Sequence, residues 1–261
     1  MKKLQHIDLE IKENIAVISL NRPDSANGLN LAIASELAYI AKECENDANI
    51  KVLVLTGKGR FFSAGGDIKE MASYKDKVGP KIKSIADNLH MAMSTFSRMK
   101  APLIIAVNGM AAGAGFSLAI SGDIVLASDK AAFVMAYTKA GLSPDGGSTY
   151  FLPRLIGLRR AQELMLTNRQ LSAQEAYDWG LINEVVEADK LLDRTMKIAG
   201  DLAVGSLGAH AAVKKLLLAS FDNGLEVQME IEGREISERA QSADGQEGIS
   251  AFMSKRAPVF K

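Results

Sequence analysis

Runs of apolar residues along the first half of the chain predict strands of two kinds. In "HIDLEIKENIAVISLNRP" (residues 6–23), apolar and polar positions alternate on both sides of Glu13 and Asn14, which predicts a β-hairpin. The segments "KVLVLTG" (51–57), "APLIIAVNG" (101–109) and "DIVLAS" (123–128) are short continuous apolar runs. Runs of this kind are typical of strands that are buried on both faces of a parallel sheet.

Two segments between these strands have the spacing of amphipathic helices. Residues 30–47 and 79–99 each place apolar side chains on one face, at Ile33, Leu37, Ile40, Ala41 and Cys44 in the first and at Ile82, Ile85, Leu89, Ala92 and Phe96 in the second. Strands that alternate with helices predict an α/β fold with a mainly parallel sheet.

The pattern changes after about Gly200. Residues 207–221, 225–241 and 244–255 are all helical in their spacing, and no strand is predicted among them. We therefore expect a core over residues 1–200 and a helical oligomerisation region over residues 201–261. A helical region without a sheet of its own must pack on the core or on another subunit.

Composition narrows the class of protein. In a chain of 261 residues, 31 basic side chains balance 31 acidic ones, which argues against nucleic acid as the main ligand. One cysteine and three histidines make a disulfide or a zinc site unexpected. Without a signal-like segment or a long apolar run, we expect a soluble cytoplasmic protein that has no membrane partner.

Two glycine-rich turns share one design. "RFFSAGGDIKEM" (60–71) and "VNGMAAGAGFSLAI" (107–120) each follow a predicted strand and lead into a predicted helix. Both place unpaired backbone N–H groups at the start of a helix, so two such turns side by side can hold one developing oxyanion. The alternative is that small residues only allow strand and helix to pack tightly. Neither turn has the full pattern of a dinucleotide-binding or phosphate-binding loop.

Three segments carry a resemblance to a known family. "FFSAGGDIKEM", "APLIIAVNGMAAGAGFSLAISGDIVLAS" and "GLSPDGGSTYFLPRLIG" resemble the signature segments of the crotonase superfamily, the enoyl-CoA hydratase/isomerase family. The similarity extends through nearly the whole chain, to "EGISAFMSKRAPVF". It implies a ClpP-like spiral of ββα units with a C-terminal helical trimerisation region. It also implies an acyl-CoA substrate, no cofactor beyond the coenzyme A moiety, no metal, and a homotrimer or a hexamer built as a dimer of trimers.

The resemblance also implies which residues form the site. Two backbone N–H groups would stabilise a thioester enolate, those of Gly66 and Ala114. Backbone from Ala64 through Asp67 to Ile68 would hold the adenine of coenzyme A. Two residues near the C-terminus would reach the coenzyme A bound by an adjacent subunit, Phe252 and Lys255.

The sequence departs from the hydratases of this family at two positions. Where the resemblance implies glutamates, this chain has Ser117 and Tyr137. Hydration needs a general base and an acid, which these side chains do not readily replace at neutral pH. We therefore expect little or no hydratase activity. We expect Ser117, Tyr137 and His90 to be among the residues that bind the substrate.

Asp145, in "GLSPDGGSTY", is the one carboxylate left at a family site position. Pro-Asp-Gly is also strong turn chemistry, so Asp145 is either a turn residue or the catalyst. The resemblance favours a proton shuttle of the Δ3,Δ2-enoyl-CoA or epoxyphenylacetyl-CoA isomerase type. One alternative is an aryl-CoA dehalogenase that uses Asp145 with His90, although His90 has a simpler interpretation as a helix residue with a structural hydrogen bond. Another alternative is a coenzyme A-binding scaffold without catalysis.

Overall fold

A mainly parallel sheet forms the centre of the computed structural model, which describes residues 4–260. The sheet has six strands, in the order β1 (Ile7–Lys12), β2 (Ile15–Leu20), β3 (Val52–Gly57), β5 (Leu103–Val107), β7 (Ile124–Ser128) and β10 (Glu184–Val186). β1 runs antiparallel to β2 as the predicted hairpin, and the other neighbouring strands are parallel. The predicted α/β class is confirmed.

A second, smaller sheet repeats the order of the first. It contains β4 (Phe61–Ser63), β6 (Met110–Ala112), β8 (Ala132–Val134) and β9 (Leu171–Ser172). β4, β6 and β8 follow β3, β5 and β7 directly in the chain, and they pair in parallel in the same order. The chain therefore steps from the large sheet to the small one in each repeat, and this step places the two glycine turns next to each other.

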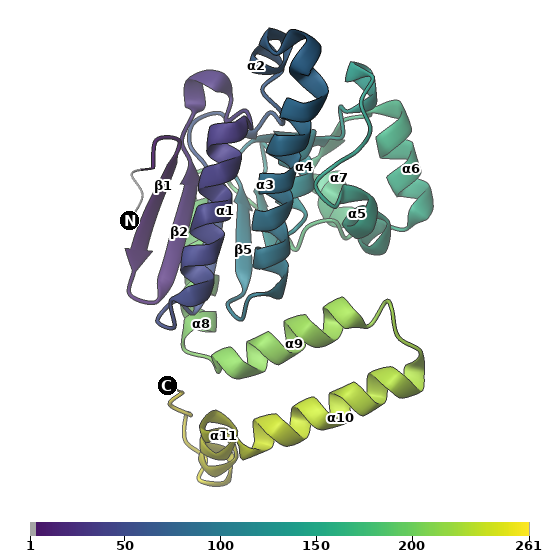
Figure 1. Cartoon of the computed structure of the whole chain (residues 1–261). Coiled ribbons are helices and arrows are strands. Elements are labelled where there is room, and N and C mark those ends of the chain that lie inside the picture. Colours follow the sequence, from purple (N-terminus) through teal and green to yellow (C-terminus); the bar gives the residue numbers. More distant parts are fainter. Residues whose placement is uncertain (1–3, 261) are drawn as a thin grey trace.

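Helices cover both faces of the large sheet (Figure 1). α1 (Leu31–Asn46) and α3 (Val78–Arg98) pack against one face and against each other, whereas α8 (Leu191–Ala203) packs against the other. Because successive strand residues point to opposite faces, Leu53 and Leu55 join the first apolar layer and Val52 and Val54 the second. Burial on both sides explains why the strands are continuously apolar.

The remaining helices connect the sheets or extend beyond them. They are α2 (Ile68–Ser73), α4 (Ala114–Ala119), α5 (Ser148–Ile156), α6 (Leu158–Thr167), α7 (Ala173–Asp178), α9 (Leu207–Ala219), α10 (Leu225–Gln241) and α11 (Ala243–Met253). Figure 1 shows α9, α10 and α11 as a separate layer below the α/β part. α8 continues past residue 200 and still packs on the sheet, so the separate layer begins at α9.

Membrane-spanning potential is confined to one bent pair of helices. Within residues 4–260, no single helix is both long and apolar enough to cross a membrane. α8 and α9 together satisfy the length and composition requirement, but they are bent by 105° where they meet.

Candidate active site

The first glycine turn leaves one backbone N–H group free. The Leu29 N–H donates to the carbonyl of Gly65 at 2.7 Å, and the Asp67 N–H donates to the carbonyl of Leu29 at 3.0 Å. In a trans peptide, C=O and N–H point in opposite directions, so fixing the Gly65 carbonyl on Leu29 turns the Gly66 N–H away from it. In the described part of the chain, this N–H has no hydrogen-bond partner.

The second turn has the same property. The Gly113 N–H donates to the carbonyl of Val134 at 3.0 Å, and the backbone of Gly113 has a φ of 50°, in the left-handed region. Ala114 then begins α4, where the first N–H groups lack partners within the helix. No residue from 4 to 260 accepts a hydrogen bond from the Ala114 N–H.

The two turns touch, and glycine makes the contact possible. A Cβ atom on Gly65 would lie 2.5 Å from the carbonyl oxygen of Ala112 and 3.2 Å from the nitrogen of Ala114, and Gly65 has a φ of 87°. Only glycine accepts both the backbone angle and the close approach. The turns pack closely because they are glycine-rich, and that packing brings the two free N–H groups together. Tight packing and oxyanion binding, which were alternative interpretations of the glycines, are therefore compatible.

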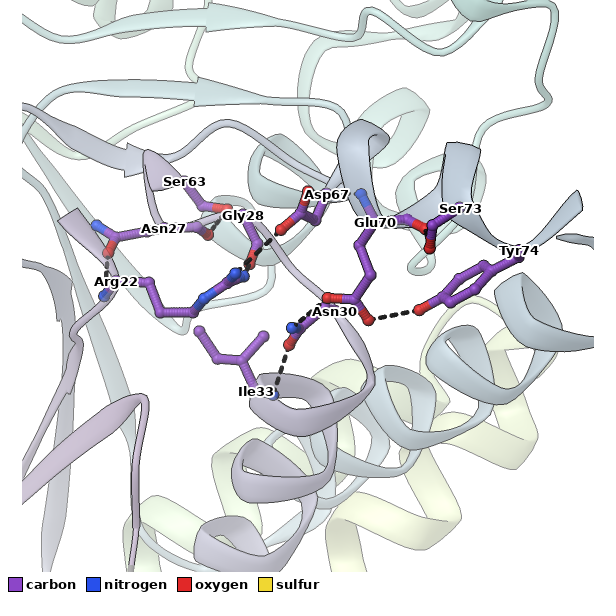
Figure 2. A network of polar contacts seen from close by, with 10 residues as sticks. All are labelled: Arg22, Asn27, Gly28, Asn30, Ile33, Ser63, Asp67, Glu70, Ser73 and Tyr74. Atoms are coloured by element: carbon purple, nitrogen blue, oxygen red, sulfur yellow. Dashed lines mark hydrogen bonds and ion pairs between the residues drawn. The ribbon is translucent and has the colours of Figure 1, made fainter. Parts of the chain in front are cut away.

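A polar network that the sequence did not reveal braces the first turn (Figure 2). Asp67 caps α2 by accepting from the Glu70 N–H at 3.1 Å, and it forms an ion pair with Arg22 at 3.0 Å. Burial would raise the pKa of Asp67, but the hydrogen bonds from Glu70 and Arg22 outweigh it and hold the pKa below its ordinary value. Both carboxylate oxygens of Asp67 therefore have partners within the protein.

The same network continues to the start of α1. Asn30 caps α1 by accepting from the Ile33 N–H at 3.1 Å, and its amide donates to Glu70 at 2.6 Å. Tyr74 donates to the other carboxylate oxygen of Glu70. The only trace of this network in the sequence is the polar run "NRPDSANGLN" directly after a buried strand. The residues that bond to this run lie about 40 positions further along the chain, so only the fold brings them together.

Both free N–H groups face one cavity of about 500 Å³. Its apolar wall comes mainly from the first turn, α2 and α3, and its lining includes Leu29, Met71, Ile82, Ile85, Leu89 and Leu142. The predicted residues Ala64, Gly66, Ile68, Ala114, Tyr137 and Asp145 also line it. The segment 70–82 supplies part of the wall. The cavity is suited to an apolar acyl group whose carbonyl oxygen accepts from the two N–H groups.

Asp145 is the only carboxylate among the described residues that line this cavity. His90 Nε2 lies 2.5 Å from its Oδ1 atom, and the two side chains are 48% and 32% exposed. Within residues 4–260, no hydrogen bond reaches Oδ2. His90 lines a separate hollow together with Gly146 and Gly147, so it contacts the acid without lining the cavity.

Ser117 and Tyr137 meet at the backbone of the same turn. Ser117 Oγ donates to the Asp145 carbonyl at 2.7 Å, and Tyr137 Oη lies 3.0 Å from Ser117 Oγ. Burial raises the pKa of Tyr137, and the hydrogen bond between the two hydroxyls only partly offsets it. Ser117 is fully buried and does not line the cavity, contrary to its expected contact with substrate.

The two C-terminal candidates lie elsewhere. Phe252 is 83% exposed, Lys255 follows α11, and neither lines the cavity of their own chain. Their contact with coenzyme A in an adjacent subunit stays a prediction. In the part of the chain that the structure describes, no group of three or more His, Cys, Asp or Glu side chains could hold a metal ion.

Comparison with known proteins places this site in a family. The model of the enoyl-CoA hydratase/isomerase family matches residues 10–261. The chain is 38% identical over 265 residues to the 1,2-epoxyphenylacetyl-CoA isomerase of Escherichia coli (strain K12), with 98% of both chains covered. It is 39% identical over 254 residues to a probable enoyl-CoA hydratase of Rhodobacter capsulatus, with 97% of both covered.

Solved structures agree with these relatives. The crystal structure of an enoyl-CoA hydratase from Polaromonas sp. JS666 superimposes with a TM-score of 0.94 at 32% identity, covering 98% of this chain and 99% of that one. The crotonase spiral with a helical C-terminal region, which the resemblance implied, is thereby confirmed. The chain belongs to the enoyl-CoA hydratase/isomerase family, the crotonase superfamily.

Proposed function

We propose that this protein is an acyl-CoA isomerase in which Asp145 carries the proton. Membership of the family makes the chain an enzyme that acts on coenzyme A thioesters. Relatives of similar identity are called isomerase and hydratase, so their names do not decide between the two reactions. The observation that carries the proposal is one carboxylate, Asp145, in a cavity that also presents both free N–H groups.

The reaction needs one group that both removes and returns a proton. Asp145 takes a proton from C2 of a 3-enoyl thioester, and the electron pair moves into a dienolate. The N–H groups of Gly66 and Ala114 donate to the dienolate oxygen as its charge develops. Protonated Asp145 then returns the proton at C4, which yields the 2-enoyl thioester and regenerates the carboxylate.

The surroundings of Asp145 support this role. His90 holds Oδ1 at 2.5 Å, which leaves Oδ2 available to accept the proton. Tyr137 also lines the cavity, and burial raises its pKa, so its hydroxyl stays protonated and is not a base. Hydration would need a second acid-base group to activate water, and the described lining contains no other carboxylate and no histidine.

The test is the Asp145→Asn variant assayed on 3-enoyl-CoA and on 1,2-epoxyphenylacetyl-CoA. We expect turnover to fall by about 10²–10⁴-fold, because the amide keeps the shape but cannot accept the proton. Crotonyl-CoA hydration should be slow already in the wild type. The Asp201→Asn variant, which changes an exposed acid of α8 outside the cavity, controls for general effects. Retention of most activity by Asp145→Asn contradicts the proposal.

A second candidate rests on the contact between His90 and Asp145. In aryl-CoA dehalogenation, an Asp145 oxygen would attack the halogen-bearing ring carbon, halide would leave, and water would hydrolyse the aryl ester while His90 accepts its proton. In water labelled with oxygen-18, this route carries the label into the Asp145 carboxylate and unlabelled oxygen into the first product. Absence of that label after turnover excludes it. Tight coenzyme A binding without turnover of any acyl-CoA would instead support a scaffold.

A further inference from the structure

The backbone carbonyl of Asp145 collects more hydrogen bonds than a carbonyl needs. Its oxygen accepts from Ser117 Oγ at 2.7 Å, from Ser148 Oγ at 2.9 Å and from the Ser148 N–H at 3.3 Å. The single hydroxyl hydrogen of Tyr137 is shared between this oxygen at 3.3 Å and Ser117 Oγ at 3.0 Å. A carbonyl oxygen has two lone pairs, so two donors would satisfy it. The donors come from α4, from the segment after β8 and from α5, which are separate in the chain.

The residues around Asp145 make such an anchor necessary. Gly146 and Gly147 follow it with φ angles of 61° and 67°, and glycine moves freely among backbone conformations. A carboxylate on a Gly-Gly turn would therefore have no fixed direction. Holding the carbonyl fixes the backbone at Asp145, and His90 at 2.5 Å fixes one carboxylate oxygen.

We propose that Ser117, Tyr137 and Ser148 act as positioning residues that set the direction of the Asp145 carboxylate by holding its backbone carbonyl. This proposal rests on the proposed isomerase function and deepens it. None of the three hydroxyls needs to touch the reacting atoms. Ser117 in particular is fully buried and outside the cavity lining, so its effect must pass through Asp145.

The arrangement gives a second meaning to the lost glutamates. Ser117 and Tyr137 stand where the resemblance implies the hydratase acids, and here their hydroxyls are joined at 3.0 Å and both reach the Asp145 carbonyl. Burial keeps Tyr137 protonated by raising its pKa, which preserves it as a donor. In this chain the side chains at positions 117 and 137 hold Asp145 in place, whereas in the hydratases the same positions would supply the catalytic glutamates.

The test compares Ser117→Ala with Ser121→Ala. Both serines are buried and donate to a backbone carbonyl, but the hydroxyl of Ser121 donates to Leu118 at 2.8 Å and not to Asp145. We expect Ser117→Ala to lower kcat on 3-enoyl-CoA by about tenfold with KM changed by less than about twofold, because misplacing a catalytic group affects the transition state most. Ser121→Ala should change neither constant.

Hydrogen exchange provides a readout that does not depend on activity. The Ser148 amide donates to the Asp145 carbonyl, so its hydrogen exchange reports on how firmly the turn is held. We expect the exchange rate of this amide to rise at least about threefold in Ser117→Ala and to stay the same in Ser121→Ala. Lower kcat together with faster exchange supports the proposal. Either effect without the other, or Ser117→Ala behaving like Ser121→Ala, overturns it. If the wild type isomerises no acyl-CoA, the proposed function fails, and the exchange rates alone then support or overturn the anchor.

Discussion

Single residues at this site depend on the backbone as much as on their side chains. Gly66 and Ala114 contribute only N–H groups, and these are free because neighbouring peptides are bonded elsewhere. Asp145 has a backbone carbonyl held by Ser117 and Ser148, and we propose that this sets the direction of its carboxylate. A substitution that changes no functional group can therefore impair the site if it moves the backbone.

Gly146→Ala tests this dependence on the backbone. An added Cβ would lie 2.9 Å from Ser117 Cβ at a φ of 61°, so the substitution combines left-handed strain with a clash against the anchor. We expect isomerase activity to fall by about tenfold or more, since displacement of a catalytic group by about 1 Å is costly. Turnover and thermal unfolding should be measured together.

Gly141→Ala is the matched control for that substitution. Gly141 has a φ of 68°, but a Cβ atom added there would meet no atom within 4 Å, so only the backbone strain of about 1–2 kcal/mol remains. The two variants should lose similar stability from strain, and only Gly146→Ala should lose most activity. Equal activity in both would show that the contact with Ser117 has no role in placing Asp145.

Among the elements, α9 is attached to the α/β part by one buried cation. Lys214 donates to the carbonyls of Phe96 and Ala101 at 2.8 and 2.9 Å, and its ammonium lies 2.8 Å from Asp123. Burial lowers the pKa of Lys214, and the interaction with Asp123 partly offsets that effect. This helix begins the C-terminal layer, so its attachment fixes where α10 and α11 lie (Figure 1).

Lys214→Met tests this attachment while keeping most of the side-chain volume. Removing the ammonium deprives two carbonyls of a donor and leaves Asp123 without its cation, although Asp123 still accepts from the Leu103 N–H. We expect this loss to cost about 3 kcal/mol and to lower Tm by about 6–12 °C. Lys197→Met is the control, because Lys197 pairs with Asp201 on the surface of α8 and the two side chains are 66% and 67% exposed. Exposed pairs contribute little, so its Tm should change by less than about 2 °C. Equal shifts in the two variants would contradict the role of Lys214.

At the scale of the whole molecule, the C-terminal layer exposes an apolar stripe. Leu225, Met229 and Ile236 share one face of α10 and are 69%, 58% and 71% exposed. Exposed apolar side chains that share a helix face are typical of an interface. The stripe supports the expected assembly into trimers or hexamers. In such an assembly, Phe252 and Lys255 of one subunit are predicted to contact the coenzyme A that an adjacent subunit binds.

Met229→Glu combined with Ile236→Glu should break that assembly. Charges buried at an interface without partners destabilise it by several kcal/mol, so the native mass should fall toward that of one chain. Leu166→Glu, at a 73% exposed position of α6, should leave the mass unchanged. Mass measured by light scattering decides the matter. A wild type that is already a monomer, or a double variant that stays assembled, contradicts the expectation.

The sequence by itself determined the alternation of strands and helices and the glycine turns that follow two of the strands. Continuous apolar strands require two covered faces, and glycine at the turns permits conformations that other residues resist, so the fold class and the turns of Gly66 and Ala114 could be predicted. The helices expected at 79–99, 207–221 and 225–241 have bounds close to those observed, because their apolar faces repeat locally.

Only the tertiary structure decided which polar groups meet. His90 lies 55 residues from Asp145, and Arg22 lies 45 residues from Asp67, so no local pattern encodes either contact. Ser117 was expected at the substrate because of its place in a motif, but its side chain points to the Asp145 carbonyl. Side-chain hydrogen bonds depend on distance and direction to within fractions of an ångström, and these are set only when distant segments pack.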